Sequence, residues 1–223
     1  MQNAIADFSR DQTLLKQRFA AVWDRNLKQS AVSKSGQVSE LIINKHQELH
    51  RHYHNTRHLA FCLAQQSEAR AQIANPDIVE LALWFHDVIY VPNARDNEDN
   101  SAALFVEMAR GQLPDNLILA IAEIIPATCH QKPPRTDDEA FVLDIDLASI
   151  GLPWEEFNRD NQALRAEAPR IHDNLYYEGK MAFLSTLLER KKIYYSEYFS
   201  KKYERNARDN IKRYLNTVSK IAN

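Results

Sequence analysis

His86 and Asp87 are the residues whose types and setting point most clearly to chemistry. They are adjacent in an apolar segment, LALWFHDVIY, which spans residues 81–90 and is expected to be helical. Burying an imidazole beside a carboxylate costs several kcal/mol unless both are paired or bind a metal ion. A core histidine bonded to a neighbour is the ordinary alternative. The adjacent aspartate favours a metal, since two side chains about 100° apart on a helix can hold one ion between them.

Four histidines precede this pair in a regular series. His46, His50, His54 and His58 recur at intervals of four residues, so spacing alone selects no pair among them. His54 and His58 share one face of a helix if that helix starts by residue 54. His46 and His50 lie near no other apolar or acidic cluster, and we expect them on a solvated helix face.

Two aspartates follow in the segment FVLDIDL, residues 141–147. Asp144 and Asp146 are two residues apart and therefore point to different faces of a helix. Only one of them can readily reach a site formed by the segments that carry His58 and His86. Asp146 has apolar neighbours and should be at least half buried, and Asp144 remains the alternative.

The order H…HD…D, with YHNTRH at its front, resembles the HD superfamily of metal-dependent phosphohydrolases. The chain is most similar to a bacterial branch of predicted HD phosphohydrolases that carries YHN-x2-H, ALWFHD-x-(V/I)-Y, DNE-x2-SA and DxDL. The corresponding segments here are YHNTRH, ALWFHDVIY, DNEDNSA and DIDL, in that order. The resemblance covers nearly the whole chain and includes the C-terminal segments WEEF, LRAE, EGK and LLERKKIYYSEYF.

The resemblance implies a role for each matching position. His58, His86, Asp87 and Asp146 match the four metal ligands, in a site that suits Mn²⁺, Mg²⁺, Fe²⁺, Ni²⁺, Co²⁺ or Zn²⁺ and is completed by water. His54 matches the histidine that protonates the leaving oxygen in the related cyclic nucleotide phosphodiesterases. Histidine suits this task because its unperturbed pKa lies near neutrality.

Five further residues are candidates for roles around the metal. Asp96 and Glu98 follow the HD pair, and they either orient a water or second ion or simply cap the next helix. His130 is a candidate for a second metal or for phosphate contact, with a plain loop histidine as the alternative. Arg51 and Arg57 flank the histidine motif and could hold a phosphate by a bidentate contact, although Arg57 could equally be a surface residue.

The elements that must position these residues are predicted to be helices. Gly is scarce, with 4 in 223 residues, whereas a sheet protein of this size needs more glycine for its turns. Apolar spacing, caps and prolines predict helices over residues 5–27, 39–49, 55–71, 76–90, 98–110, 114–126, 136–149, 179–193 and 197–221. We therefore predict an all-α, HD-domain helical bundle: a single domain over 1–223, with a core of about 36–150 and a C-terminal helical extension over 151–223.

Composition limits the partners. The net charge is −2, so a nucleic acid polymer is not an expected partner. Cys62 and Cys129 form no CxxC motif and are predicted to be packing residues in a reduced, cytoplasmic protein. The sequence predicts no signal peptide and no membrane partner. The long C-terminal helices could pair in a homodimer.

These features lead to a functional hypothesis. The chain is expected to hydrolyse a small phosphorylated substrate, such as a nucleotide, by means of a water that the metal activates. Two alternatives stay open. One is an HD-fold di-iron oxygenase, which would need more than four ligands, and the other is a non-catalytic module that binds a metal or a nucleotide.

Overall fold

Helices make up the whole regular structure of the described chain. The computed structural model describes residues 12–219, and no strand occurs among them, so the predicted all-α class is confirmed. The α-helices of this part are α2 (Gln12–Asp24), α3 (Ser35–His46), α4 (Thr56–Ala69), α5 (Pro76–Phe85), α6 (Asn97–Ala109), α7 (Asp115–Ile124), α8 (Asp137–Asp146), α9 (Trp154–Ala166), α10 (Asp173–Glu189) and α11 (Glu197–Val218). None of these helices has both the length and the apolar character that crossing a bilayer requires.

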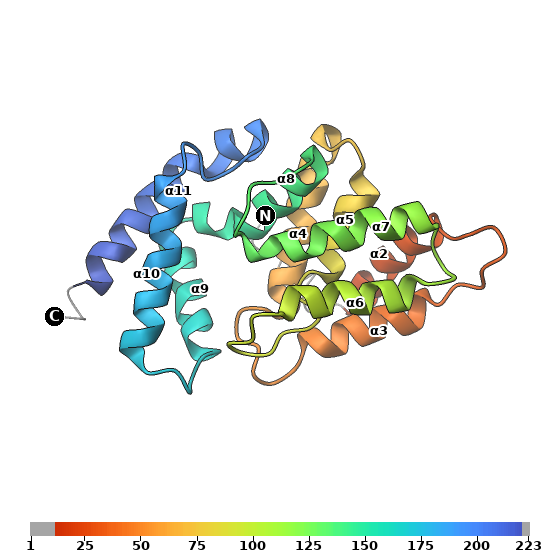
Figure 1. Cartoon of the computed structure of the whole chain (residues 1–223), viewed down its shortest axis with the longest axis horizontal. Helices are drawn as coiled ribbons and strands as arrows, with labels where there is room; N and C mark the ends of the chain where they lie inside the picture. The colour runs from red at the N-terminus through yellow and green to blue at the C-terminus, as the bar shows by residue number, and fades with distance from the viewer. Residues whose placement is uncertain (1–11, 220–223) are drawn as a thin grey trace.

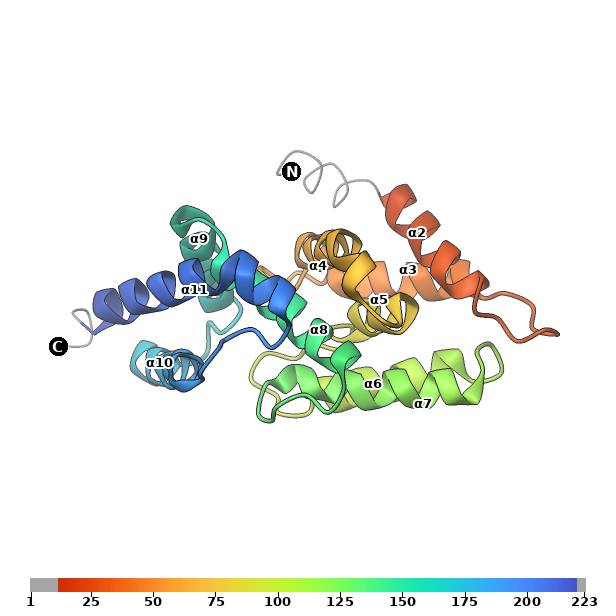
Figure 2. The ribbon, with the colours of Figure 1, turned by 90° about the horizontal axis from the view of Figure 1, so that it is seen from above.

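Helix α5 lies at the centre of the bundle formed by α2 to α8. Pro76 occupies its first turn, where a missing N–H costs nothing, and every residue from Val79 to Phe85 is buried. Helices α2, α3 and α4 lie on one side of α5, and α6 and α7 form a layer on the other side (Figure 2). Phe19 on α2 packs edge-on against Trp84 on α5, with 5.2 Å between ring centroids. The bundle thus includes α2, which precedes the predicted core boundary at residue 36.

Helices α9, α10 and α11 form the C-terminal extension, beside the bundle (Figure 1). A 3-10 turn, Leu147–Gly151, connects it to α8 and packs against α11. Gly151 is required here, because a Cβ on it would lie only 2.5 Å from the Cβ of Tyr203 on α11. Asn210 secures the same contact by donating its amide to the carbonyls of Ile150 and Leu152.

Several predicted helix boundaries differ from the observed ones. Helix α5 ends at Phe85 instead of continuing to Tyr90, and α4 begins at Thr56, so His54 precedes its helix. Helix α3 spans 35–46 rather than 39–49, and α10 begins at 173 rather than 179. One half of the predicted capping box of α8 is observed: the Thr136 hydroxyl accepts the N–H of Glu139, whereas the Glu139 carboxylate accepts from Arg135. The ends predicted at residues 5–11 and 220–221 lie outside the described residues.

Candidate metal centre

Two imidazoles and two carboxylates meet between the start of α4, the end of α5 and the end of α8. The Nε2 atoms of His58 and His86 lie 3.4 Å apart. Asp87 Oδ2 lies 3.0 Å from His86 Nε2 and 3.4 Å from His58 Nε2. Asp146 Oδ1 lies 3.3 Å from His58 Nε2 and 3.5 Å from His86 Nε2. The structure therefore brings together all four residues that the sequence proposed as metal ligands.

Local backbone geometry aims His86 at this point. Its N–H donates to the carbonyl of Ala82, so the residue continues the helical path by one step beyond α5. Its Nδ1 donates to the carbonyl of Leu83 at 2.8 Å, which leaves Nε2 as the nitrogen that can ligate a metal. The chain then turns, because Val88 N–H bonds to Phe85 O, and the turn places Asp87 beside His86. The predicted continuation of the helix through residue 90 was wrong, because α5 ends at Phe85 and the HD pair lies in this turn.

The donor set fits a divalent ion. Asp87 Oδ2 is buried and has no hydrogen-bond partner among the described residues. Burial alone would raise the pKa of Asp87, but the charges of His86 and His54 outweigh it and hold this pKa below the ordinary range. Burial likewise acts to lower the pKa of His86, and Asp87 and Asp146 outweigh it and raise that pKa. Imidazole nitrogens and carboxylate oxygens that converge in this way are typical ligands of divalent transition metals.

Cys62 adds a thiol to the same cluster. The ligand atoms of His58, Cys62, His86 and Asp146 all lie within 4.8 Å of one another. Cys62 Sγ is 3.6 Å from His58 Nε2, because the two residues are one helical turn apart on α4. Burial raises the pKa of the thiol. The sequence predicts Cys62 to be a packing residue, although its spacing of four from His58 is a signal that it could join the cluster.

Asp146 has a second partner in His130. His130 Nε2 donates to Asp146 Oδ2 at 2.7 Å, and His130 Nδ1 is buried with no partner in the described chain. His130 has a φ of 58°, which is uncommon for a residue other than glycine, and its carbonyl accepts from Arg190 Nη2. His130 is thus fixed beside the cluster, on the Asp146 side.

Asp144 faces away from the cluster. It is fully buried and accepts the N–H groups of Tyr195 and Ser196, each at 2.7 Å, as well as the Ser196 hydroxyl at 2.6 Å. Ser196 is the N-cap of α11, so Asp144 supports the start of that helix. Burial raises the pKa of Asp144 to about 6. Of the two candidates for the fourth ligand, the geometry therefore favours Asp146.

The two acids after the HD pair lie in different environments. Glu98, on the first turn of α6, is half-buried, and its pKa is raised by burial and then by the charges of Asp87 and Asp146. That influence places Glu98 within electrostatic range of the cluster. Asp96 is exposed and occupies the N-cap position of α6, without a side-chain capping bond. Of these two acids, only Glu98 therefore lies within electrostatic range of the predicted ligands.

His54 lies at the edge of the cluster and is held by a residue from the C-terminal extension. Its ring centroid is 5.9 Å from that of His58 and 4.2 Å from that of Tyr90, on which it stacks. His54 Nδ1 donates to Glu167 Oε2 at 2.7 Å, while Glu167 Oε1 accepts the N–H groups of Tyr53 and His54. Burial acts to raise the pKa of Glu167, but the bonds from His54 lower it below its ordinary value. Glu167 is the last residue of the segment LRAE, but nothing in that segment indicates a contact with His54, because the two residues are far apart in the chain.

Neither candidate arginine is placed as the predicted phosphate contact. Arg51 is buried, and its guanidinium donates to Glu48 and to the carbonyls of His54, Asp87 and Val88. Four of its five N–H donors are therefore used by the protein. This gives Arg51 a structural role: it secures the loop before α4 to the HD turn.

Arg57 is exposed on α4. Its Nη2 lies 3.6 Å from Asp160 on α9, so it faces the extension and not the four predicted ligands.

The two earlier histidines are not equivalent. His50 is exposed, as expected, and contacts the carbonyl of Tyr90. His46 is fully buried, so the prediction of a solvated face was wrong for it. Its Nδ1 donates to the carbonyl of Ile42, and burial, followed by the charge of Arg51, lowers its pKa to about 3. A neutral imidazole with one internal bond can occupy a core position.

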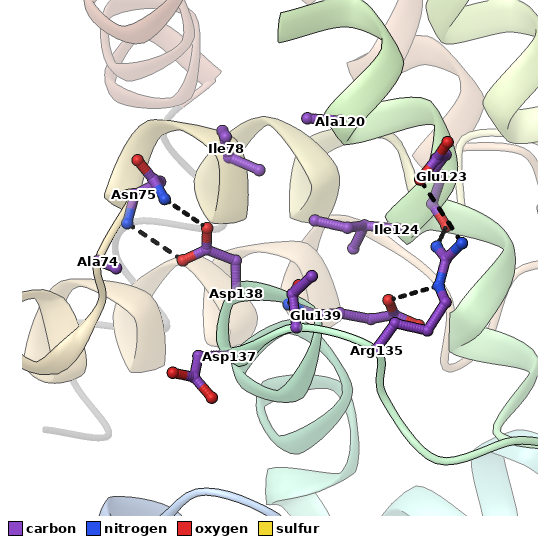
Figure 3. Close-up of a pocket in the computed structure, with 11 residues that line it drawn as sticks. Ala74, Asn75, Ile78, Ala120, Glu123, Ile124, Arg135, Asp137, Asp138 and Glu139 are labelled. Carbon is purple, nitrogen blue, oxygen red and sulfur yellow. Dashed lines mark hydrogen bonds and ion pairs between the residues drawn. The ribbon is translucent and has the colours of Figure 1, made fainter. Parts of the chain in front are cut away.

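A pocket of about 450 Å³ lies apart from the four predicted ligands, at the start of α8 (Figure 3). Its polar groups are largely occupied by one another. Asp138 accepts the backbone N–H and side-chain amide of Asn75, and Arg135 pairs with Glu139. These contacts secure the start of α8, and through it the position of Asp146 at the other end of that helix.

Comparison with known proteins gives no match to a family model, a curated protein or a solved structure. The contacts around His58, His86, Asp87 and Asp146, together with the motif resemblance, are therefore the basis for a functional proposal.

Proposed function

We propose that this protein is a metal-dependent phosphohydrolase that acts on a small phosphoester. The observation that carries the proposal is the convergence of two histidine nitrogens and two carboxylates. One oxygen of each carboxylate lies within 3.5 Å of both nitrogens, and a third histidine lies beside them. The resemblance of YHNTRH, ALWFHDVIY and DIDL to HD phosphohydrolases supports the same chemistry.

The exposure of the ligand side chains indicates the direction from which a substrate arrives. The side chains of His58 and His86 are 2% and 0% exposed, whereas those of Asp87 and Asp146 are 15% and 17% exposed. His54 is 19% exposed. The imidazoles thus form the inner wall of the centre, and a substrate approaches over the carboxylates and His54.

Each residue has a distinct task in this proposal. His58, His86, Asp87 and Asp146 would hold the ion. A divalent ion supplies Lewis-acid chemistry: it makes water a nucleophile near neutral pH and offsets charge on phosphoryl oxygens. The Nδ1–H group of His54 is engaged in its hydrogen bond to Glu167. Nε2 is therefore the atom that can donate a proton to the leaving oxygen.

A screen of phosphoesters tests this proposal. The chain is stripped of metal with a chelator and then assayed with Mn²⁺, Mg²⁺, Ni²⁺ or Co²⁺ against nucleoside monophosphates, cyclic and linear dinucleotides, and nitrophenyl phosphates. We expect turnover that requires a metal and that is lost in the Asp146→Ala variant. Absence of turnover for every ester with every ion would contradict the proposal.

A di-iron oxygenase is the second candidate, and the surroundings of Asp146 favour it as the alternative. His130 bonds to Asp146 Oδ2, and Glu98 lies within electrostatic range, so both are available as additional ligands for a second ion. Iron analysis with a visible absorption spectrum separates the two functions. Two irons per chain with oxygen-dependent bands would favour the oxygenase, whereas a colourless metal-dependent esterase would favour the phosphohydrolase.

A further inference from the structure

Helix α10 of the C-terminal extension contacts a residue at the edge of the predicted ligand cluster. In its second half, the ring of Phe183 lies 6.3 Å from that of His130, which bonds to Asp146. Near its start, Tyr176 lies within electrostatic range of Tyr90 and Glu167, the two residues that hold the His54 ring. The two ends of one helical face therefore border the two histidines that flank the centre.

Lys180 lies on this same face, between those two aromatic residues. It follows Tyr176 by four positions and precedes Phe183 by three, and such positions share one side of a helix. Leu184 and Leu187, on the same side, are fully buried, and Lys180 itself is half-buried. Lys180 therefore lies on the side of α10 that carries the contact with His130 and the buried leucines.

No carboxylate of the described chain pairs with Lys180. Its ammonium forms no ion pair or hydrogen bond within the described residues, in contrast to Lys28, Lys45 and Lys202, which each pair with an acid. The charged group that acts on it is Asp160, which lies nearer to Arg57. Burial lowers the pKa of Lys180 to about 8, so at neutral pH it still carries a charge. A half-buried ammonium without a carboxylate partner is available to bind an anionic ligand.

We propose that Lys180 binds a phosphoryl oxygen of the substrate, from the wall of the site formed by α10. This inference deepens the proposed function and rests on it, since it places the phosphate between the metal ligands and α10. Lysine is a common phosphate ligand that acts as a point charge. The C-terminal extension would then supply a substrate contact as well as Glu167.

Phosphate binding to the metal-loaded protein tests Lys180 directly. The full chain is loaded with Mn²⁺, and its affinity for inorganic phosphate is measured by calorimetry. We expect Lys180→Met to weaken this affinity about tenfold or more, the range for a charge-assisted hydrogen bond, with Mn²⁺ content unchanged. Lys180→Arg should largely restore it. Lys191→Met, which removes an exposed lysine just after α10, is the matched control and should bind phosphate like the wild type.

The design also guards against a folding defect. Methionine keeps the length of the lysine stem and removes only the charge, so the unfolding temperature of Lys180→Met should equal or exceed that of the wild type. Equal phosphate affinity in Lys180→Met and wild type would overturn the inference, and so would absence of phosphate binding by the wild type.

The role of Lys180 and the proposed hydrolysis can fail separately. If the wild type hydrolyses an ester and Lys180→Met leaves its KM unchanged, the role of Lys180 is refuted and hydrolysis stands. If Lys180→Met weakens phosphate binding while no ester is hydrolysed, Lys180 is an anion ligand and the hydrolase proposal fails.

Discussion

At the scale of single residues, the surroundings of Asp87 Oδ2 favour a bound metal ion. This oxygen is buried without a hydrogen bond, yet it lies 3.0 Å from one imidazole nitrogen and 3.4 Å from another. A buried carboxylate oxygen in that state is costly unless something positive occupies the space between the groups. The apolar setting of the HD pair allowed this site to be anticipated. Glu167 and Lys180 belong to the segments LRAE and EGK, but their proposed roles could not be anticipated from spacing, because they lie far from the HD pair in the chain.

Cys62 should be a neighbour of the metal and not an essential ligand. Its thiol has a raised pKa because it is buried, and Mn²⁺ prefers oxygen and nitrogen donors to sulfur. We expect Cys62→Ser to bind Mn²⁺ with unchanged stoichiometry, as measured by equilibrium dialysis. Loss of the ion in this variant would make Cys62 a ligand and would point to a thiolate-binding metal such as Zn²⁺.

Glu167 should act as a positioning residue for His54. In Glu167→Gln the amide nitrogen or oxygen must replace a carboxylate that binds three N–H groups. We expect kcat for a phosphoester to fall by about 10²-fold, the usual range for loss of acid–base assistance, while KM changes little. Steady-state kinetics checks this split. A rise in KM with unchanged kcat would mean that Glu167 serves substrate binding and not His54.

His46 should make stability depend on pH. Its pKa is about 3 in the folded chain, against an ordinary value of 6.5, so between these values the unfolded chain binds the additional proton. The free energy of unfolding therefore falls as pH decreases below 6.5, by on the order of 1 kcal/mol per pH unit. Urea unfolding at pH 7 and pH 5 should show a smaller loss for His46→Leu than for the wild type. Equal losses would show that His46 is not the titrating group.

At the scale of helices, sequence pattern predicted which segments are helical better than where they end. The apolar stretch before His86 continues to Tyr90, so hydrophobicity gave no sign that α5 stops at Phe85. The stop arises from contacts that only the fold provides, such as the bonds from Arg51 to the carbonyls of Asp87 and Val88. Thr136 was predictable because its cap partner Glu139 is local.

Gly151 should be essential to the contact between α11 and the 3-10 turn. Gly151→Ala places a Cβ 2.5 Å from Tyr203 Cβ, and we expect a loss of about 1–3 kcal/mol in the free energy of unfolding, as for other overpacked sites. Gly179→Ala is the matched control, because it lies within α10 with open space around it and should gain roughly 0.5–1 kcal/mol. Denaturant titration of both variants measures this. An undiminished stability of Gly151→Ala would show that the contact adapts freely.

For the whole molecule, the extension and the bundle together form the candidate site. The bundle supplies the four predicted ligands on α4, after α5 and on α8, whereas Glu167 and Arg190 of the extension hold His54 and His130. The sequence predicted both parts and their helical character, since low glycine content and apolar periodicity are properties of the chain itself. It did not predict how they meet, because the contacts between the two parts join residues that are far apart in the chain, such as His54 and Glu167.

Metal content per chain measures the centre most directly. Wild-type, Asp87→Ala and Asp96→Ala chains are incubated with Mn²⁺, freed of excess metal and analysed by mass spectrometry of the element, with circular dichroism as a check of folding. Asp96 is the control, because it is an exposed acid in the loop that follows the HD turn. We predict at least one ion per chain in the wild type and in Asp96→Ala, and none in Asp87→Ala. A folded Asp87→Ala chain that keeps its full metal content would contradict the proposed centre.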